Sequence, residues 1–137
     1  MKIAAHFTVA ELTGTNITEL FAQNILYALD HFNELIRLAQ FCEKVREILG
    51  VPMRVTSGVR YEALNKIVGG TSNSDHIKLL AVDFVPVNMT LKKAFDKIRN
   101  SNLDYKQIIL EKNSWIHISI GDKKEALVYD GKKYKRV

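Results

Sequence analysis

The pattern of hydrophobic and polar positions divides the chain into a helical first part and a second part rich in short β-prone segments. Apolar residues recur at helical spacing over residues 17–29 and again over 32–49, and Gly50 and Pro52 follow as stop signals. Two shorter helices are predicted over 61–68 and over 91–99, the latter with Thr90 as its N-cap. The first part is therefore expected to be a helical scaffold.

The β-prone segments follow this scaffold. They cover residues 53–56, 81–85, 106–111, 115–120 and 126–129, and an Asp130-Gly131 pair then predicts a hairpin to a final strand. The order is helices, then mixed elements, then consecutive strands. It favours an α+β fold with a small antiparallel sheet backed by the N-terminal helices, rather than a doubly wound parallel sheet. The length, 137 residues, fits a single domain over residues 1–137.

Composition narrows the class of protein. Hydrophobic residues make up 47% and charged residues 26%, as in ordinary globular proteins. The single cysteine, Cys42, lies in an apolar helical run and is expected to be a small buried hydrophobe, so no disulfide is possible. Neither a membrane span nor a signal peptide is apparent, which predicts synthesis in the cytoplasm without an export signal.

The formal net charge is +5, and the excess gathers near the C-terminus at Lys132, Lys133, Lys135 and Arg136. Such a surface attracts nucleic acids, anionic lipids and anionic wall polymers. The chain has no aromatic-interleaved nucleic-acid motif, zinc-finger spacing or phosphate-binding glycine loop, so we expect no nucleic-acid partner and no membrane insertion.

The four histidines differ in their surroundings. His6 and His31 have no acidic or histidine partner at ligand spacing, which indicates structural or surface roles. His76 follows a polar loop over 69–75 and precedes Asp83 by seven residues. Because a buried carboxylate is costly without a partner, Asp83 within an apolar strand should be paired, hydrogen-bonded or bound to a metal.

His117 lies in a second apolar strand, where the period-2 alternation places it on one face with Trp115 and Ser119. Two imidazoles and one carboxylate, with a fourth position open to water, form the ligand set of a catalytic zinc site. A closed structural site is excluded because it usually needs several thiolates. From residue chemistry alone, a metal site and a plain polar cluster are equal alternatives, and several divalent ions suit these ligands.

Six short motifs follow one another in order along the chain. They are Arg54-Val55-Thr56-Ser57-Gly58-Val59-Arg60, Leu64-Asn65, Val68-Gly69-Gly70, Ser74-Asp75-His76, Ala81-Val82-Asp83-Phe84 and Trp115-Ile116-His117-Ile118-Ser119. Together they resemble the zinc D-Ala-D-Ala carboxypeptidase-like peptidases, a family of peptidoglycan carboxypeptidases, D,D-dipeptidases and phage endolysins that cut L-Ala-D-Glu bonds. The resemblance covers about residues 7–120.

The resemblance implies that His76, Asp83 and His117 bind Zn²⁺. It implies that Arg60, at the end of the Thr-Ser-Gly-x-Arg motif, holds the substrate and polarises its carbonyl. Ser74 resembles a residue that lines the substrate site, although a hydroxyl that stabilises the loop is an equally good interpretation.

Two positions depart from the family pattern. Leu79 stands where relatives carry glycine, so the loop backbone is expected to differ there. Ser114 stands where many relatives carry the catalytic acid, and Glu111 is the candidate replacement, as in a sub-branch of the family. If residues 112–114 form a three-residue hairpin loop, Glu111 faces Trp115 and is the diagonal neighbour of His117, at roughly 7–8 Å. A surface glutamate at a hairpin end is the alternative.

The resemblance therefore predicts a zinc peptidase that acts on the peptide part of peptidoglycan, as a monomer, after release to the wall by a separate partner. A phage-type endopeptidase is favoured over a carboxypeptidase. The alternative is a catalytically inactive wall-binding or phage structural module of the same fold, which Leu79 and Ser114 favour.

Overall fold

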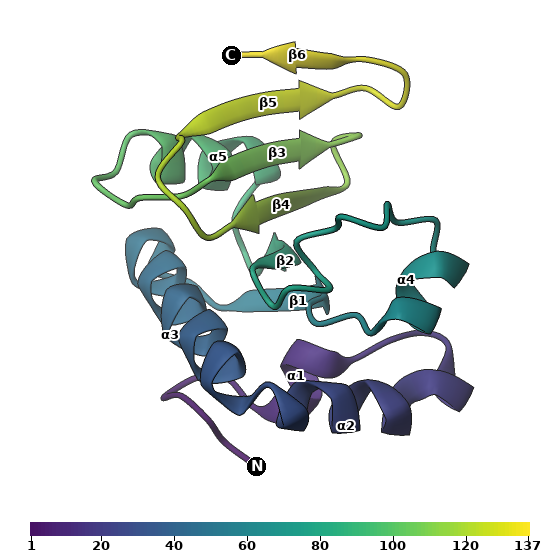
Figure 1. The fold of residues 1–137 in the computed structure, drawn as a ribbon. Coiled ribbons are helices and arrows are strands. Elements are labelled where there is room, and N and C mark those ends of the chain that lie inside the picture. The colour runs from purple at the N-terminus through teal and green to yellow at the C-terminus, as the bar shows by residue number, and fades with distance from the viewer.

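The computed structural model describes all residues 1–137 as a six-stranded sheet with helices packed around it (Figure 1). The helices are α1 (Val9–Thr13), the 3₁₀ turn η1 (Thr18–Leu20), α2 (Phe21–Asp30), α3 (Phe32–Leu49), α4 (Glu62–Ile67) and α5 (Leu91–Arg99). The strands are β1 (Met53–Ser57), β2 (Ala81–Pro86), β3 (Gln107–Glu111), β4 (Trp115–Ser119), β5 (Glu125–Tyr129) and β6 (Tyr134–Arg136). The predicted α+β class is confirmed.

Capping interactions mark the ends of two helices. Gly50 follows α3 in the left-handed conformation with φ of 73°, and its amide donates to the Arg46 carbonyl oxygen. The predicted cap of α5 is present, because the Thr90 hydroxyl accepts a hydrogen bond from the Lys93 amide. No helix has both the length and the apolar character needed to cross a membrane.

The strand order is β1-β2-β4-β3-β5-β6, and every neighbouring pair but one is antiparallel. The exception is β3 with β5, which run parallel, so the expected antiparallel sheet is wrong at this pair. The cause is strand order: β4 lies between β2 and β3, so β5 cannot pair with β4 and joins the edge of β3 instead. A strand that returns antiparallel to β4 runs parallel to β3. The connection passes the start of β3 at Gly121, where a Cβ would lie 2.6 Å from the Cβ of Lys106.

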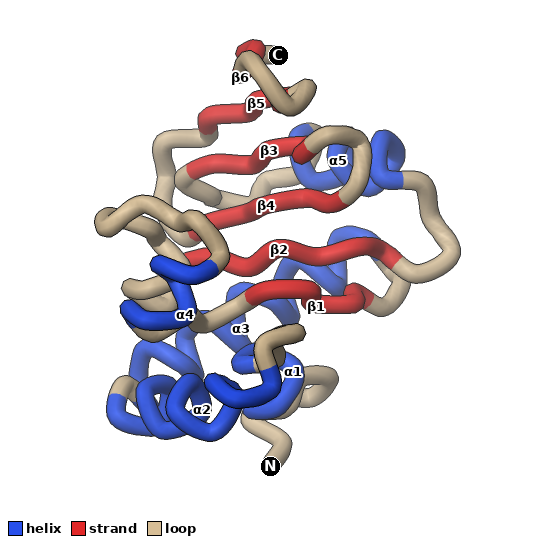
Figure 2. Tube along the Cα trace, turned by 90° about the vertical axis from the view of Figure 1, so that its right-hand side faces the viewer, coloured by secondary structure: helices blue, strands red, loops and turns tan.

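The two faces of the sheet differ in chemistry. Ile116 and Ile118 are fully buried and belong to one core with Phe95 and Ile98 of α5. Alternation along β4 directs His117 to the opposite face. Figure 2 shows α5 and α3 behind the strands, and α4 with its neighbouring loops in front of one end of them. The sheet face that carries His117 is therefore not covered by α3 or α5 and lies next to residues 58–80.

Candidate metal centre

Three separate segments bring His76, Asp83 and His117 together. Asp83 on β2 and His117 on β4 are direct cross-strand partners, and His76 enters from the loop after α4. One carboxylate oxygen of Asp83, Oδ1, lies 2.9 Å from Nδ1 of His117 and 3.4 Å from Nε2 of His76. The three candidate ligand atoms lie within 4.8 Å of one another. The predicted ligand trio is therefore a single cluster in space.

The backbone orients His76. Its Nδ1 lies 2.7 Å from the Gly58 carbonyl oxygen and donates to it, which leaves Nε2 facing Asp83. Gly58 must be glycine, because a Cβ there would lie 2.4 Å from the Leu12 carbonyl oxygen. That same oxygen accepts a hydrogen bond from the Val59 amide. The contact with α1 thus fixes the backbone just after β1, and the Gly58 carbonyl there orients His76.

Asp83 carries the negative charge of the cluster. Asp83 is only 8% exposed, and this burial alone would raise the pKa of its carboxyl group. Hydrogen bonds with His117 and His76 outweigh burial and hold the pKa of Asp83 well below its usual range. The carboxylate is therefore ionised and turned toward two imidazole nitrogens, which is an arrangement suited to a cation.

Arg60 lies beside the cluster and is fixed within the chain. Its Nε donates to the Ser57 hydroxyl and its Nη1 to Asn65 Oδ1, both at 3.1 Å, while Nη2 lies 3.6 Å from Asp83 Oδ2. Burial lowers the pKa of Arg60, and the Asp83 carboxylate opposes that shift. Gly70 leaves the room for this arrangement, because a Cβ there would meet Asn65 Oδ1 at 2.1 Å.

Asn24 supports the Arg60 loop, and sequence reasoning missed it. Its amide nitrogen donates to the carbonyl oxygens of Thr13 and Val59, and its oxygen accepts from the Tyr61 amide. The two loop contacts flank Arg60 directly. A buried asparagine within the apolar pattern of 17–29 was the available signal, since a buried amide needs partners.

Glu111 lies at the end of β3, directly opposite Trp115, as the three-residue loop predicted. Lys112 and Asn113 in that loop have left-handed backbone conformations with φ of 52°. Burial raises the pKa of Glu111, and the Asp83 carboxylate adds to this shift, whereas His117 and Lys112 oppose it. The residue is half-buried, and because it pairs with Trp115 it lies on the same face of the sheet as His117.

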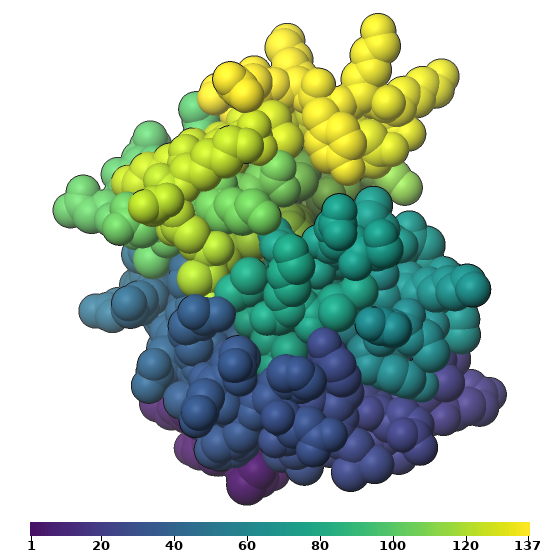
Figure 3. Space-filling view, in the orientation of Figure 1, coloured from purple at the N-terminus to yellow at the C-terminus, as the bar shows by residue number.

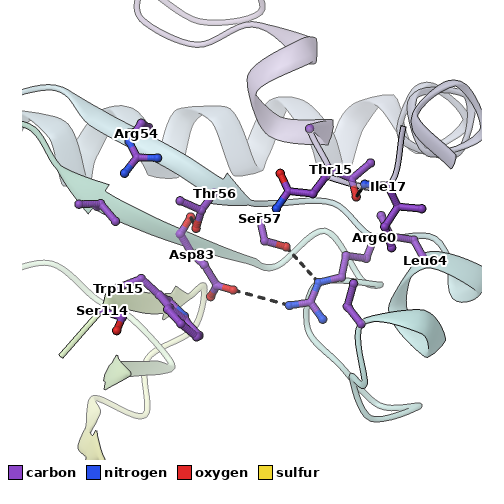
Figure 4. Close-up of a pocket in the computed structure, with 14 residues that line it drawn as sticks. Thr15, Ile17, Arg54, Thr56, Ser57, Arg60, Leu64, Asp83, Ser114 and Trp115 are labelled. Atoms are coloured by element: carbon purple, nitrogen blue, oxygen red, sulfur yellow. Dashed lines mark hydrogen bonds and ion pairs between the residues drawn. The ribbon is translucent and has the colours of Figure 1, made fainter. Parts of the chain in front are cut away.

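Two hollows meet at this cluster. The first is lined by the three candidate ligands together with Ser74, Glu111 and Tyr134, among others. The second extends from Ile17 and Leu64 past Arg60 to Arg54 and Ser114 (Figure 4). Arg60, Val68, Asp83 and Trp115 line both. In Figure 3 the C-terminal hairpin stands directly above the 60–80 segment, so these two parts of the chain face each other.

Ser74 lies beside the first candidate ligand in the loop after α4. It lines the first hollow, and its hydroxyl accepts a hydrogen bond from the His76 amide at 3.2 Å. Leu79 has a φ of 58°, which is the left-handed conformation that glycine favours. The backbone at Leu79 therefore adopts a conformation that glycine favours, although the residue is leucine.

The remaining histidines and the cysteine lie outside the cluster. His6 contacts Glu43 through Nδ1 at 2.7 Å, and Nδ1 of His31 donates to the Tyr27 carbonyl oxygen. Cys42 is fully buried, as expected, and burial raises the pKa of its thiol. None of the three lines either hollow.

The donor set fits a divalent metal. Two imidazole nitrogens and an ionised carboxylate oxygen converge, and the second nitrogen of His76 is held by a backbone carbonyl, as is usual for metal-bound histidines. With three protein donors, one coordination position is left for water or substrate.

Comparison with known families supports this interpretation of the site. The family model described as Peptidase M15 matches residues 5–119, which include all three candidate ligands, Arg60 and Glu111. No individual curated protein matches the chain. Members of the family are zinc-dependent metallopeptidases that act on peptidoglycan. The chain belongs to the Peptidase M15 family, the zinc D-Ala-D-Ala carboxypeptidase-like peptidases.

Proposed function

We propose that this protein is a zinc peptidase that hydrolyses amide bonds in peptidoglycan stem peptides. The observation that carries the proposal is the cluster of His76, Asp83 and His117, whose ligand atoms lie within 4.8 Å in a member of a metallopeptidase family. These three side chains would hold the metal. A bound zinc ion supplies Lewis acidity toward a carbonyl oxygen and lowers the pKa of coordinated water.

Glu111 is the general base in this proposal. It lines the same hollow as the three ligands, and its half-buried position keeps the carboxylate close to their charges. It would accept a proton from the attacking water and return it to the leaving amine. Ser114 cannot perform this step, because a hydroxyl is a poor base at neutral pH.

Arg60 would stabilise the negative charge that develops on the carbonyl oxygen, or hold a substrate carboxylate. Its guanidinium is already positioned by Ser57, Asn65 and Asp83, so little reorganisation accompanies the reaction. Ser74 would help to line the substrate site while its hydroxyl fixes the His76 backbone. These roles are those that the family motifs imply.

An endopeptidase of the endolysin type is favoured over a carboxypeptidase. Hollows extend from the cluster in two directions and share Arg60, Asp83 and Trp115. A substrate chain can therefore continue on both sides of the bond that is cut. We further propose that the protein acts as a monomer at the cell wall.

Digestion of purified wall sacculi tests the proposed function. The wild-type protein with zinc is expected to release peptides whose new amino and carboxyl termini, identified by mass spectrometry, define the bond. Glu111→Gln is the matched control: it should keep zinc and lose activity by a factor on the order of 10²–10⁴. Binding to sacculi without any new termini would instead support an inactive wall-binding module.

A further inference from the structure

The second hollow contains two arginines that differ in how they are engaged. Arg60 is nearly enclosed, with 13% of its side chain exposed, and directs nitrogens to Ser57, Asn65 and Asp83. Arg54 is exposed, and no hydrogen bond or ion pair within the chain engages its guanidinium. The cation that is free to meet a ligand in this hollow is therefore Arg54.

The register of the sheet fixes where Arg54 lies. It is the direct partner of Val85, which is two residues from Asp83 along β2 and shares its face. The spacing along the strand is about 7 Å, which is the length of two residues in an extended chain. Figure 4 shows Arg54 and Arg60 on opposite sides of Asp83. Arg54 therefore stands one to two peptide residues away from the candidate metal ligands.

The surroundings favour an anionic ligand. Asp83 is the only acidic residue that lines this hollow, and it already interacts with two histidines and Arg60. Val85, the cross-strand partner of Arg54, and Trp115 add apolar surface to the same hollow. A guanidinium against such surface binds carboxylates well, because its fork of N–H groups can donate two parallel hydrogen bonds.

We propose that Arg54 determines substrate specificity by binding a carboxylate of the peptide, one or two residues from the bond that is cut. This inference rests on the proposed peptidase function and names its substrate class: peptides with a free carboxyl group close to the scissile bond. Arg60 would stabilise the charge on the reacting carbonyl oxygen, whereas Arg54 binds the carboxylate of a neighbouring substrate residue.

The test uses two synthetic stem peptides that span the bond identified in the sacculus digest. They differ only in whether the residue next to that bond carries a free carboxyl group or a carboxamide. The values of kcat/KM are compared for the wild type, Arg54→Gln, Arg54→Lys and Arg37→Gln. Arg37 is an exposed arginine of α3 that lines neither hollow, so it is a matched control for loss of one positive charge.

The wild type and Arg37→Gln are expected to prefer the free acid by about tenfold, the value of one charge-assisted hydrogen bond. Arg54→Gln should bring the ratio close to one, and Arg54→Lys should restore part of it. An equal rate for both peptides in the wild type, or a full preference in Arg54→Gln, would overturn the role of Arg54 while leaving the hydrolase intact. If the wild type cuts sacculi but neither peptide, the role of Arg54 fails and the hydrolase stands. If the sacculus digest yields no new termini, both proposals fail.

Discussion

Leu79 combines a strained backbone with a buried side chain. Its φ of 58° is left-handed, which costs an L-residue roughly 1–2 kcal/mol, yet the residue is only 1% exposed and packs in the core. Burial of a leucine side chain contributes about 1.5–3 kcal/mol, which offsets the strain. Leucine can therefore occupy a position whose backbone favours glycine.

Two substitutions separate these contributions. Leu79→Ala should lower the free energy of unfolding by about 2–4 kcal/mol and keep the strain. Leu79→Gly removes the same contacts but also the strain, so we expect it to be about 1 kcal/mol more stable than Leu79→Ala in urea unfolding. At Leu35, buried in α3, the order should be reversed, because glycine is the poorer helix former. A glycine variant less stable than the alanine variant at position 79 would refute the strain.

The pH dependence of hydrolysis tests Glu111. Its pKa is raised above the usual 4.5 by burial, and a base must be ionised, so activity should be present above the raised pKa and lost as pH falls through it. Lys112 lowers the pKa of Glu111. Lys112→Gln should therefore move the acid limb of kcat/KM to higher pH, while the exposed Lys44→Gln should leave it in place. No movement in Lys112→Gln would argue against Glu111 as the base.

At the scale of elements, local patterns predicted most of the structure. The stop at Gly50, the Thr90 cap and the alternation over 115–120 are properties of neighbouring residues, and each is present as expected. The approach of Asp83 to His117 was implied only by the family resemblance, because the strand patterns place each residue in a strand but do not pair β2 with β4.

Contacts between distant segments could not be predicted in this way. Asn24 reaches residues 35 and 37 positions away, and the Gly58 carbonyl meets His76 across 18 positions. The parallel pairing of β5 depended on which sheet edge was still free, which no local pattern records. The free guanidinium of Arg54 could not be predicted either, because it depends on which side chains surround it in the folded chain.

The connection from β4 to β5 passes so close to Lys106 that only glycine fits at position 121. A methyl group there would lie 2.6 Å from Lys106 Cβ and 3.1 Å from its Cα, so the backbone must shift. Gly121→Ala should lower the free energy of unfolding by about 1–3 kcal/mol, as overpacking usually does. Gly14→Ala is the control, because its methyl would meet nothing closer than 3.4 Å. Equal stability of the two variants in denaturant titrations would show that the connection from β4 to β5 is not closely packed against Lys106.

At the scale of the whole molecule, the candidate metal centre adds a second connection between segments that the core already joins. The loop after α4, β2 and β4 each contribute one ligand, while a single cluster of 25 buried residues connects the helices to the sheet. A metal bound only by the folded state stabilises it by about 2.7 kcal/mol at a free concentration of 100 times Kd.

Thermal unfolding should therefore show one cooperative transition whose Tm rises with zinc and falls with a chelator. His117→Ala should lose this response, because one of three ligands is missing. Calorimetry of both proteins with and without zinc measures the effect. A Tm of the wild type that does not depend on zinc would speak against a metal bound by the folded chain.

Zinc stoichiometry tests the central claim most directly. Elemental analysis of the purified protein after dialysis should give one zinc ion per chain for the wild type and for His6→Ala, whose histidine contacts Glu43 instead. His117→Ala should retain none. A wild-type protein without zinc, or a His117→Ala protein that keeps a full equivalent, would contradict the assignment of His76, Asp83 and His117 as the metal ligands.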